Sequence, residues 1–243
     1  MENQDSSELR DIRLQKLRSI KSSKKDPYPA KATRTAEISK TLDKFTEWSE
    51  QKKKITLAGR LMSKREHGGL VFGDIKDFSG DMQILIKKDH IPEKMWEFFI
   101  DLVDIGDFIS VQGDLFLTQK QEKTLLAGKI NIIAKSLRPL PEKWHGLVDI
   151  ETRFRQRYLD LLMNEGIKER FIIRHKLVQE LRNFLIKQGF VEVDTPALQP
   201  LPGGALAAPF KTHYDAMDTD VYLRIAPELY LKRLIIGGFE KVF

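Results

Sequence analysis

The chain has 243 residues, of which 41% are hydrophobic and 31% charged, so it can bury a core beneath a strongly charged surface. It has no cysteine, which excludes disulfides and thiolate chemistry, and with only 5 histidines a zinc site is not expected. The net charge of +6 suits a nucleic-acid partner or a solvated surface with spare lysines. The sequence has no apolar run long enough to predict a membrane span, and its charged N-terminus does not resemble a secretory signal. A cytoplasmic location is therefore expected.

Residues 1–54 are predicted to form an N-terminal helical arm. Within residues 8–25, four apolar positions lie close to helical spacing, namely Leu9, Ile12, Leu17 and Ile20. Two prolines in residues 26–29 end this helix, and a polar stretch with another helix continues to about Lys54. The first helix is either a basic, RNA-facing helix or an ordinary surface helix.

Residues 55–140 are predicted to form an OB-fold. Five segments have the alternation and β-branched content of strands, namely 55–65, 70–77, 81–88, 107–119 and 124–137. Residues 91–103, between the third and fourth segments, have helical spacing. This order is typical of the OB-fold, a small Greek-key barrel whose second and third strands often bind nucleic acid.

Residues 141–167 are charged and predicted to form a hinge with a short helix. From Lys168 to Gln188 an amphipathic helix carries one apolar stripe, made of Ile173, Leu177, Leu181, Phe184 and Leu185. Gly189 ends the helix, and residues 190–198 alternate as a strand that breaks at Pro196.

The last twenty-two residues indicate a strand, a helix, a glycine stop and the start of another strand. Pro227 suits the first turn of the helix, while Gly237 and Gly238 suit its exit. We expect a fold that ends by opening a strand to belong to a longer chain.

Several of these motifs together resemble those of class II lysyl-tRNA synthetases of the bacterial type. Residues 174–196 are similar to the first class II motif, and the likeness extends from about Arg10 to the last residue. Segments matching the lysyl branch are Arg138–Pro141, Arg153–Leu161, Pro202–Ala205, Pro209–Phe210 and Arg224–Leu234. One departure is Ala208, which stands where the family commonly has an arginine, so an ionic contact from that loop is not expected.

The resemblance implies an α+β protein, in which the five-stranded barrel is followed by the beginning of an antiparallel catalytic sheet with helices in residues 168–243. Enzymes of this family activate lysine with ATP and Mg²⁺, then transfer it to the 3′ end of their tRNA. They act as homodimers, with no DNA or membrane partner. The family's second and third motifs and its magnesium-binding carboxylates are expected beyond Phe243. We therefore assign no catalytic or metal-binding residue here, and expect no lysine-dependent ATP–pyrophosphate exchange from this chain alone.

The barrel carries the predicted anticodon site. Val71 and Ile75 share one strand face and leave Phe72 on the other, and Gln83 likewise points away from its neighbours Met82 and Ile84. A ring and an amide on the outer face can stack on and bond a nucleobase, although a solvated Gln beside a Phe that covers the barrel mouth fits the same pattern. The resemblance places anticodon-reading residues at Arg65, Phe72, Gln83 and Glu122. Burial of Phe72 and Gln83 inside the barrel would contradict this interpretation.

The predicted lysine pocket combines a glycine pair with a carboxylate. Gly203 and Gly204 permit close approach of a ligand, and Glu228 at a helix start can bind an ammonium group. A turn glycine pair and an ordinary first-turn Glu are the alternative. The resemblance places Gly204 and Glu228 against the lysine α-ammonium.

The resemblance also assigns a dimer interface, made of Arg174, Leu177, Leu181 and Pro196. We expect residues from about 168 onward to be disordered or aggregation-prone in isolation, because they expose apolar helix faces and sheet edges.

Arg224 and Arg233 are expected to form buried structural pairs, and neither His145 nor His213 is given a catalytic role.

Two other functions fit the sequence. A stand-alone tRNA-binding module would keep the barrel without catalysis. An aspartyl- or asparaginyl-type synthetase would share the barrel and the first motif, but those branches typically carry Gln where this chain has Glu228.

Overall fold

The structure, a computed structural model, describes residues 2–141 and 146–243, with side chains from Ser7 onward. The chain divides into two compact units, Met1–Gly146 and Leu147–Phe243. Over the described ranges, no helix is long and apolar enough to cross a membrane. The elements of the first unit are α1 (Glu2–Ser22), α2 (Ile38–Asp43), α3 (Phe45–Glu50), β1 (Ile55–His67), β2 (Leu70–Lys76), β3 (Asp81–Lys87), α4 (Glu93–Glu97), the π-helical turn η1 (Phe98–Leu102), β4 (Phe108–Leu117) and β5 (Lys123–Ala134).

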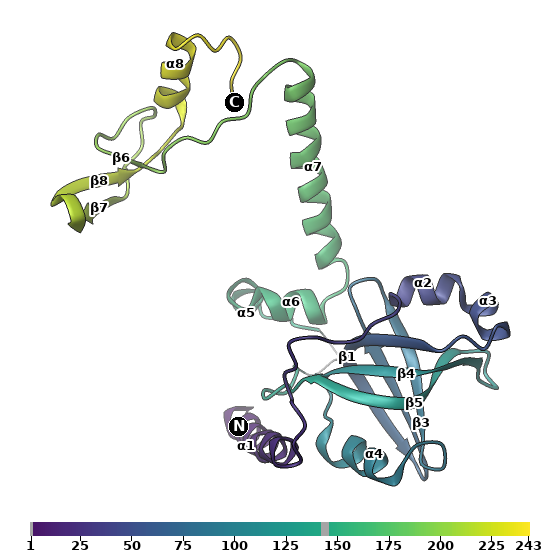
Figure 1. The fold of residues 1–243 in the computed structure, drawn as a ribbon. Coiled ribbons are helices and arrows are strands. Elements are labelled where there is room, and N and C mark those ends of the chain that lie inside the picture. Colours follow the sequence, from purple (N-terminus) through teal and green to yellow (C-terminus); the bar gives the residue numbers. More distant parts are fainter. Residues whose placement is uncertain (1, 142–145) are drawn as a thin grey trace. The chain divides into compact units, whose positions relative to one another are not determined.

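The five strands of the first unit close into a barrel in the order β1-β2-β3-β5-β4 (Figure 1). All neighbouring strands are antiparallel except β3 and β5, which pair in parallel. Val71, Gly73 and Ile75 of β2 point inward and are buried, while the residues between them are half-buried on the outer face. The predicted OB-fold is confirmed, with its helix after the third strand.

One glycine permits the closest approach of two strands. The β4–β5 register shifts between Gln112 and Gly113, where the ladder contains a bulge. A Cβ atom at Gly113 would lie 1.8 Å from the carbonyl oxygen of Leu126. No side chain fits at this position without separating β4 from β5.

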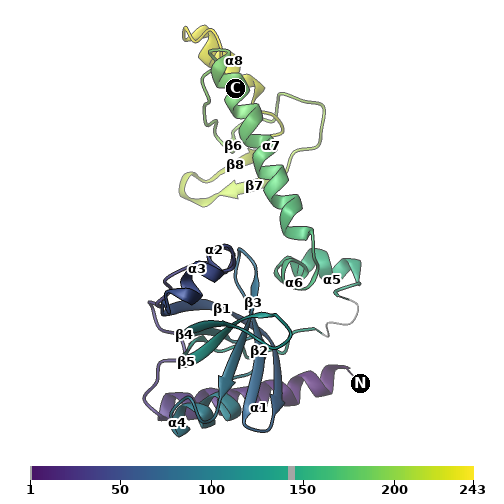
Figure 2. The same cartoon turned by 90° about the vertical axis from the view of Figure 1, so that its right-hand side faces the viewer.

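Helices close both ends of the barrel, as Figures 1 and 2 show. At one end α2 and α3 add Ile38, Phe45 and Trp48 to the core, while η1 adds Phe98 and Phe99 at the other. The helix α1 lies beside η1 and buries Ile20 in the same core. The unit therefore has one continuous hydrophobic core.

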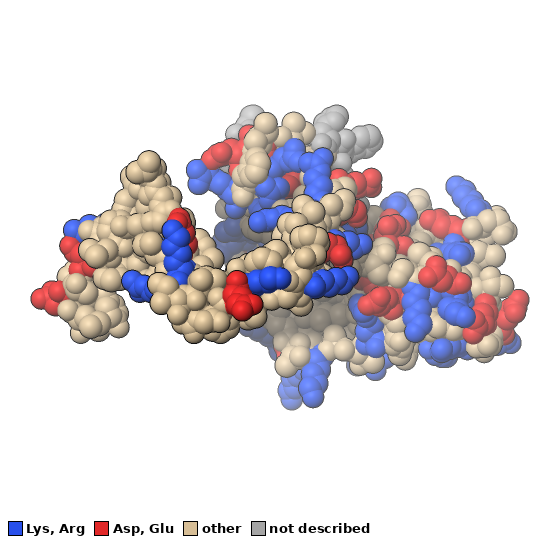
Figure 3. Space-filling view, turned by 90° about the horizontal axis from the view of Figure 1, so that it is seen from above, with Lys and Arg blue, Asp and Glu red and all other residues tan. Residues whose placement is uncertain are grey.

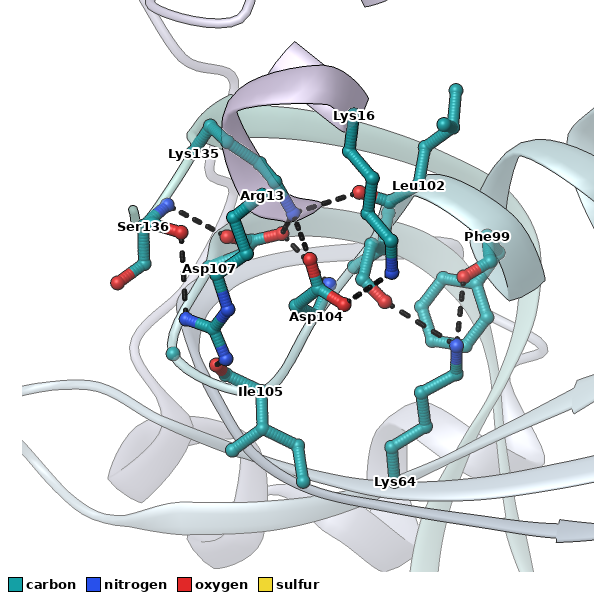
Figure 4. A network of polar contacts seen from close by, with 12 residues as sticks. Arg13, Lys16, Lys64, Phe99, Leu102, Asp104, Ile105, Asp107, Lys135 and Ser136 are labelled. Atoms are coloured by element: carbon teal, nitrogen blue, oxygen red, sulfur yellow. Dashed lines mark hydrogen bonds and ion pairs between the residues drawn. The ribbon is translucent and has the colours of Figure 1, made fainter. Parts of the chain in front are cut away.

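The helix α1 is held to the barrel by polar contacts that the sequence pattern did not predict (Figure 4). The Arg13 guanidinium donates to three carbonyl oxygens, those of Ile105 at 3.0 Å, Arg138 at 3.1 Å and Ser136 at 3.4 Å. The predicted apolar stripe is only partly correct, because Ile20 is buried but Leu9 and Ile12 are exposed. The C-terminal half of α1 docks on the barrel, so α1 is not a free RNA-facing arm over that half.

A buried lysine lies at the centre of this network. The Lys135 ammonium is fully buried and lies 2.5 Å from an Asp104 oxygen and 2.8 Å from an Asp107 oxygen. Lys16 of α1 reaches the other Asp104 oxygen at 2.6 Å. Burial by itself raises the pKa of Asp104, but the hydrogen bonds and charges of Lys135 and Lys16 outweigh burial and hold the pKa below its usual value.

The second unit contains helices and a small sheet. Its elements are α5 (Ile150–Arg155), α6 (Arg157–Met163), α7 (Ile167–Lys187), β6 (Leu198–Gln199), β7 (Lys211–Tyr214), the 3₁₀ turn η3 (Asp215–Met217), β8 (Thr219–Leu223) and α8 (Glu228–Ile236). The three strands pair antiparallel in the order β6-β8-β7. The α+β class predicted from the sequence, a barrel followed by an antiparallel sheet with helices, is confirmed.

A buried carboxylate joins α5 to α6. Asp160 accepts hydrogen bonds from Arg153 Nε at 2.8 Å, from Asn164 Nδ2 at 2.7 Å and from Arg157. Burial raises the pKa of Asp160, but these donors and the charge of Arg153 more than offset it, so the pKa lies below its usual value. The hinge segment is thus organised by one fully paired acid.

The strand predicted over residues 190–198 is mostly absent. Val191 forms an isolated parallel bridge to Val242, and only residues 198–199 are assigned to a strand, β6. The amide of Val193 donates to the carbonyl oxygen of Phe243 at 3.0 Å. The predicted final strand therefore pairs with residues 191–193, but this pairing is too short to form a ladder.

Candidate nucleic-acid interface and amino-acid pocket

The strand register gathers the four predicted anticodon residues on one outer face of the barrel. Arg65 of β1 lies opposite Phe72 of β2, while Asp74, two residues on, lies opposite Gln83 of β3. Glu122 precedes β5 and contacts Gln83. The prediction that Phe72 and Gln83 point away from the core is confirmed, because the buried core contains their neighbours and neither of them.

Gln83 is nevertheless buried, with 7% of its surface exposed, so the alternative of a solvated Gln does not hold. Its Nε2 donates to Glu122 Oε2 at 2.8 Å, and its Oε1 accepts from Thr124 Oγ1 at 2.8 Å. The parallel pairing of β3 with β5 lays Thr124 beside Gln83, and this long-range contact cannot be read from strand alternation. Gln83 therefore lies outside the core but within a polar cluster.

Phe72 and Arg65 remain accessible on this face. Phe72 is half-buried, and the side chain of Arg65 is 49% exposed. Arg65 Nη1 lies 3.1 Å from Asp74 Oδ2, and Ser63 Oγ also donates to Asp74. The face thus offers a ring for stacking, a cation held in place by a carboxylate, and the Gln83–Glu122 pair for base-edge hydrogen bonds.

The loop that supplies Glu122 is itself ordered by backbone contacts. The Thr118 amide donates to the carbonyl oxygen of Glu122 at 3.1 Å. In return, the Glu122 amide donates to Thr118 Oγ1, also at 3.1 Å. This loop joins β4 to β5, one of the two OB-fold loops that commonly contact oligonucleotides. Sequence reasoning missed Thr124, although its neighbour in β5, Leu125, faces the core, so that Thr124 must point to the outer face.

In the second unit, Gly204 and Glu228 come close together. Gly204 has φ of +90°, and a Cβ atom there would lie 3.4 Å from Ala226 Cβ and 3.8 Å from Glu228 Cβ. A Cβ at Gly203 would be 2.9 Å from Leu229 Cδ1. The glycine pair therefore lies against the first turn of α8, where the Glu228 carboxylate accepts from Lys232 Nζ at 2.5 Å.

The two arginines near this pocket are exposed, which corrects the expectation of buried pairing. Arg224 donates to the carbonyl oxygens of Thr195 and Pro196 and to Thr195 Oγ1, so it orders the chain after α7. Arg233 lies over the Tyr230 ring, with its central carbon 5.4 Å from the ring centroid.

His213 has acidic neighbours that sequence spacing did not reveal. Its Nδ1 lies 3.2 Å from Asp220 and its Nε2 lies 3.4 Å from Asp218. The β7–β8 hairpin brings these residues together, and hydrogen bonds from Lys211 and His213 lower the pKa of Asp220. His145 falls outside the described residues. In the described part of the chain, no group of three or more His, Asp and Glu residues could hold a metal ion.

The predicted dimer residues of α7 lie on an exposed apolar stripe. Leu177 is 60% exposed and Leu181 is 57% exposed, and Arg174 and Pro196 are also exposed. In Figure 3, the left part of the view, where β7, β8 and α8 lie in Figure 1, is mostly covered by uncharged residues. The second unit therefore exposes apolar surface at both α7 and α8.

Each of the two units contains a segment that matches a known protein family. Residues 55–139 match the OB-fold nucleic acid binding domain, and residues 149–243 match the family of class II tRNA synthetases (D, K and N). The lysine–tRNA ligase of Carboxydothermus hydrogenoformans is 48% identical over 243 residues, which are 100% of this chain and 49% of that protein. Lysine–tRNA ligases of Syntrophomonas wolfei (46% identical over 98% of this chain) and Pelotomaculum thermopropionicum (48% over 99%) match over 48% and 47% of their own lengths.

The chain thus spans about half the length of the curated relatives that it matches. The two family matches agree with the barrel in the first unit and with the helices and antiparallel sheet in the second. Residues 55–139 belong to the OB-fold nucleic-acid-binding domains, and residues 149–243 belong to the class II tRNA synthetases of the D, K and N group.

Proposed function

We propose that this chain is part of a lysine–tRNA ligase, which activates lysine with ATP and transfers it to the 3′ end of its tRNA. The observation that carries the proposal is identity of 46–48% to several lysine–tRNA ligases over nearly the whole chain. The barrel would bind the anticodon, and the second unit would contribute to the lysine pocket.

The proposed anticodon site consists of Arg65, Phe72, Gln83 and Glu122. Their common outer face supports it, because a stacking ring lies in register with a cation and next to a donor–acceptor pair. Bases that are splayed out of an RNA loop are recognised by such combinations of stacking and edge hydrogen bonds.

The proposed lysine contacts are Gly204 and Glu228. Gly204 lies close to Glu228, since a Cβ atom at Gly204 would be 3.8 Å from Glu228 Cβ, and the Glu228 carboxylate already binds one ammonium group, that of Lys232. The α-ammonium of a lysine ligand would take the place of Lys232 at this carboxylate. Such charge-assisted hydrogen bonds are the strong ones in protein sites.

ATP and Mg²⁺ are the cofactors proposed for the complete ligase, because the family uses both. Within the described residues, no cluster of His, Asp and Glu fits a metal ion, so no step of the mechanism is assigned to Mg²⁺ here. The bound ions would neutralise phosphate charge during adenylation. In this proposal, the residues of this chain bind and orient lysine and the tRNA, and none of them acts as a nucleophile.

A homodimer and a cytoplasmic location complete the proposal, without a DNA or membrane partner. Exposed apolar residues on α7 support self-association, since Leu177 and Leu181 would otherwise stay in water. Arg174 and Pro196 flank the same proposed interface.

The test is a binding comparison of purified tRNAs specific for lysine, aspartate and asparagine with the 243-residue chain. Tighter binding of the lysine tRNA is expected. Preference for the aspartate or asparagine tRNA would assign the chain to another branch of the D, K and N group and refute the proposal.

A further inference from the structure

A buried hydroxyl lies directly behind the proposed anticodon site. Thr124 is fully buried, and β5 places it in register with Gln83 of β3. Its Oγ1 donates to Gln83 Oε1 at 2.8 Å and also lies 3.1 Å from the carbonyl oxygen of Glu122. Thr124 therefore contacts both Gln83 and Glu122, without itself being accessible to RNA.

We propose that Thr124 is a positioning residue that fixes the orientation of the Gln83 amide for base recognition. This inference rests on the proposed function of the barrel face. An amide group has similar size at its two ends, so packing alone does not decide whether its oxygen or its nitrogen faces outward.

The chemistry of the two neighbours decides the orientation. The Glu122 carboxylate accepts hydrogen bonds only, so it requires the amide nitrogen, which lies 2.8 Å from Oε2. The Thr124 hydroxyl supplies a donor to the amide oxygen at the other end. After an amide flip, the amide oxygen would face the Glu122 carboxylate oxygen, and two acceptors with no proton between them repel each other.

The fixed amide has a consequence for the ligand. With Nε2 bonded to Glu122 Oε2, the second amide N–H of Gln83 and the Glu122 Oε1 form an adjacent donor–acceptor pair. Such a pair matches a nucleobase edge on which an acceptor lies beside an N–H donor. Without the Thr124 hydroxyl, the buried Gln83 oxygen loses its donor and only Glu122 holds the amide, so the donor–acceptor pair is less well preorganised.

Two variants test the inference: Thr124→Val replaces the hydroxyl by a methyl group, and Thr124→Ser keeps the hydroxyl and removes the methyl group. Binding of the full chain to a synthetic anticodon stem–loop of lysine tRNA is measured by fluorescence anisotropy, alongside a loop with replaced anticodon bases. We expect Thr124→Val to weaken binding of the cognate loop by roughly tenfold while binding of the replaced loop changes little. Thr124→Ser should restore both affinity and selectivity.

The outcomes separate this inference from the proposed function. If Gln83→Ala loses selectivity but Thr124→Val keeps it, the role of Thr124 is refuted and the anticodon site stands. Equal losses in Thr124→Val and Thr124→Ser would likewise refute the role of the hydroxyl. If the unmodified chain does not prefer the cognate loop, the proposed function fails and this inference fails with it.

A measurement on the unmodified chain does not depend on the folding of any variant. The Gln83 side-chain amide proton that binds Glu122 should exchange with solvent more slowly than the side-chain amide protons of exposed glutamines in ¹⁵N-resolved NMR spectra, because Gln83 is buried and bonded at both ends of its amide. Gln83 amide protons that exchange as fast as those of exposed glutamines would show a mobile amide and overturn the proposal.

Discussion

Phe72 is available for stacking because Val71 and Ile75 already fill the barrel interior from the same strand. Stacking of a base on an aromatic side chain contributes about 1–3 kcal/mol in single-stranded nucleic-acid complexes. Removing the ring should therefore affect RNA binding more than folding.

We predict that Phe72→Ala weakens binding of the lysine anticodon stem–loop by roughly 5- to 150-fold, as measured by fluorescence anisotropy. Phe78→Ala, which removes a phenylalanine that is 72% exposed in the turn between β2 and β3, serves as the matched control and should bind normally. Equal effects of the two substitutions would argue against stacking at Phe72.

Asp104 links the stability of the first unit to pH. Its pKa lies below the usual value in the folded state, although burial opposes this, because Lys135 and Lys16 bind the carboxylate. A lowered folded pKa gives stability that is present above the unfolded pKa of about 3.9 and is lost as pH falls towards the folded pKa.

We therefore predict that the free energy of unfolding, measured with urea, falls as the pH drops below about 4. Asp104→Asn should be less stable at neutral pH and should show a smaller fall on acidification, since it cannot be protonated. An identical pH dependence in the variant and the unmodified chain would contradict this role of Asp104.

At the scale of elements, the β4–β5 hairpin depends on Gly113. We predict that Gly113→Ala destabilises the protein by roughly 3 kcal/mol or more, because its Cβ would lie 1.8 Å from the Leu126 carbonyl oxygen and the strands would have to separate. Gly128→Ala in the same hairpin is the matched control, since its nearest atom would be 3.7 Å away. Urea unfolding of both variants makes the comparison, and similar losses would contradict it.

The helix α7 has an apolar stripe that its own unit leaves exposed. We predict that replacing Leu177 and Leu181 together by Lys weakens self-association by at least about a hundredfold, because each buried Leu contributes about 1.5–3 kcal/mol. Gln179→Lys, on the opposite face of α7, should leave association unchanged. Analytical ultracentrifugation measures both, and dimers that survive the double substitution would place the interface elsewhere.

Local pattern predicted most elements of the barrel, because alternation and turn residues determine strands with one buried face. It also placed Phe72 and Gln83 on the outer face. It did not predict the burial of Gln83, which depends on the parallel partner β5, nor the His213–Asp220 contact, which depends on hairpin register. The continuous strand expected over residues 190–198 was wrong, because strand formation needs a continuous partner and residues 191–193 and 197–198 pair with two different segments.

The expectation that residues from about 168 onward are disordered or aggregation-prone in isolation stays a prediction. The structure contains helices and a small sheet there, and many of their apolar side chains are exposed. Weak amide-exchange protection across residues 190–243 is expected, and strong protection would contradict it.

At the scale of the whole molecule, the two units have different physical character. The first has a closed barrel, one continuous core and a polar network that holds α1 in place. The second has a three-stranded sheet and exposed apolar helix faces. The first unit is therefore expected to be stable on its own, and the second is expected to need further contacts to be stable.

The proposed function places the anticodon of lysine tRNA on the outer face of the barrel. Chemical-shift mapping of the ¹⁵N-labelled chain with the lysine anticodon stem–loop tests this placement. We predict that perturbed amides cluster on β1, β2, β3 and residues 118–124, with Phe72 and Gln83 near the centre. Perturbations confined to α1 or to residues 147–243, with that face unchanged, would contradict it.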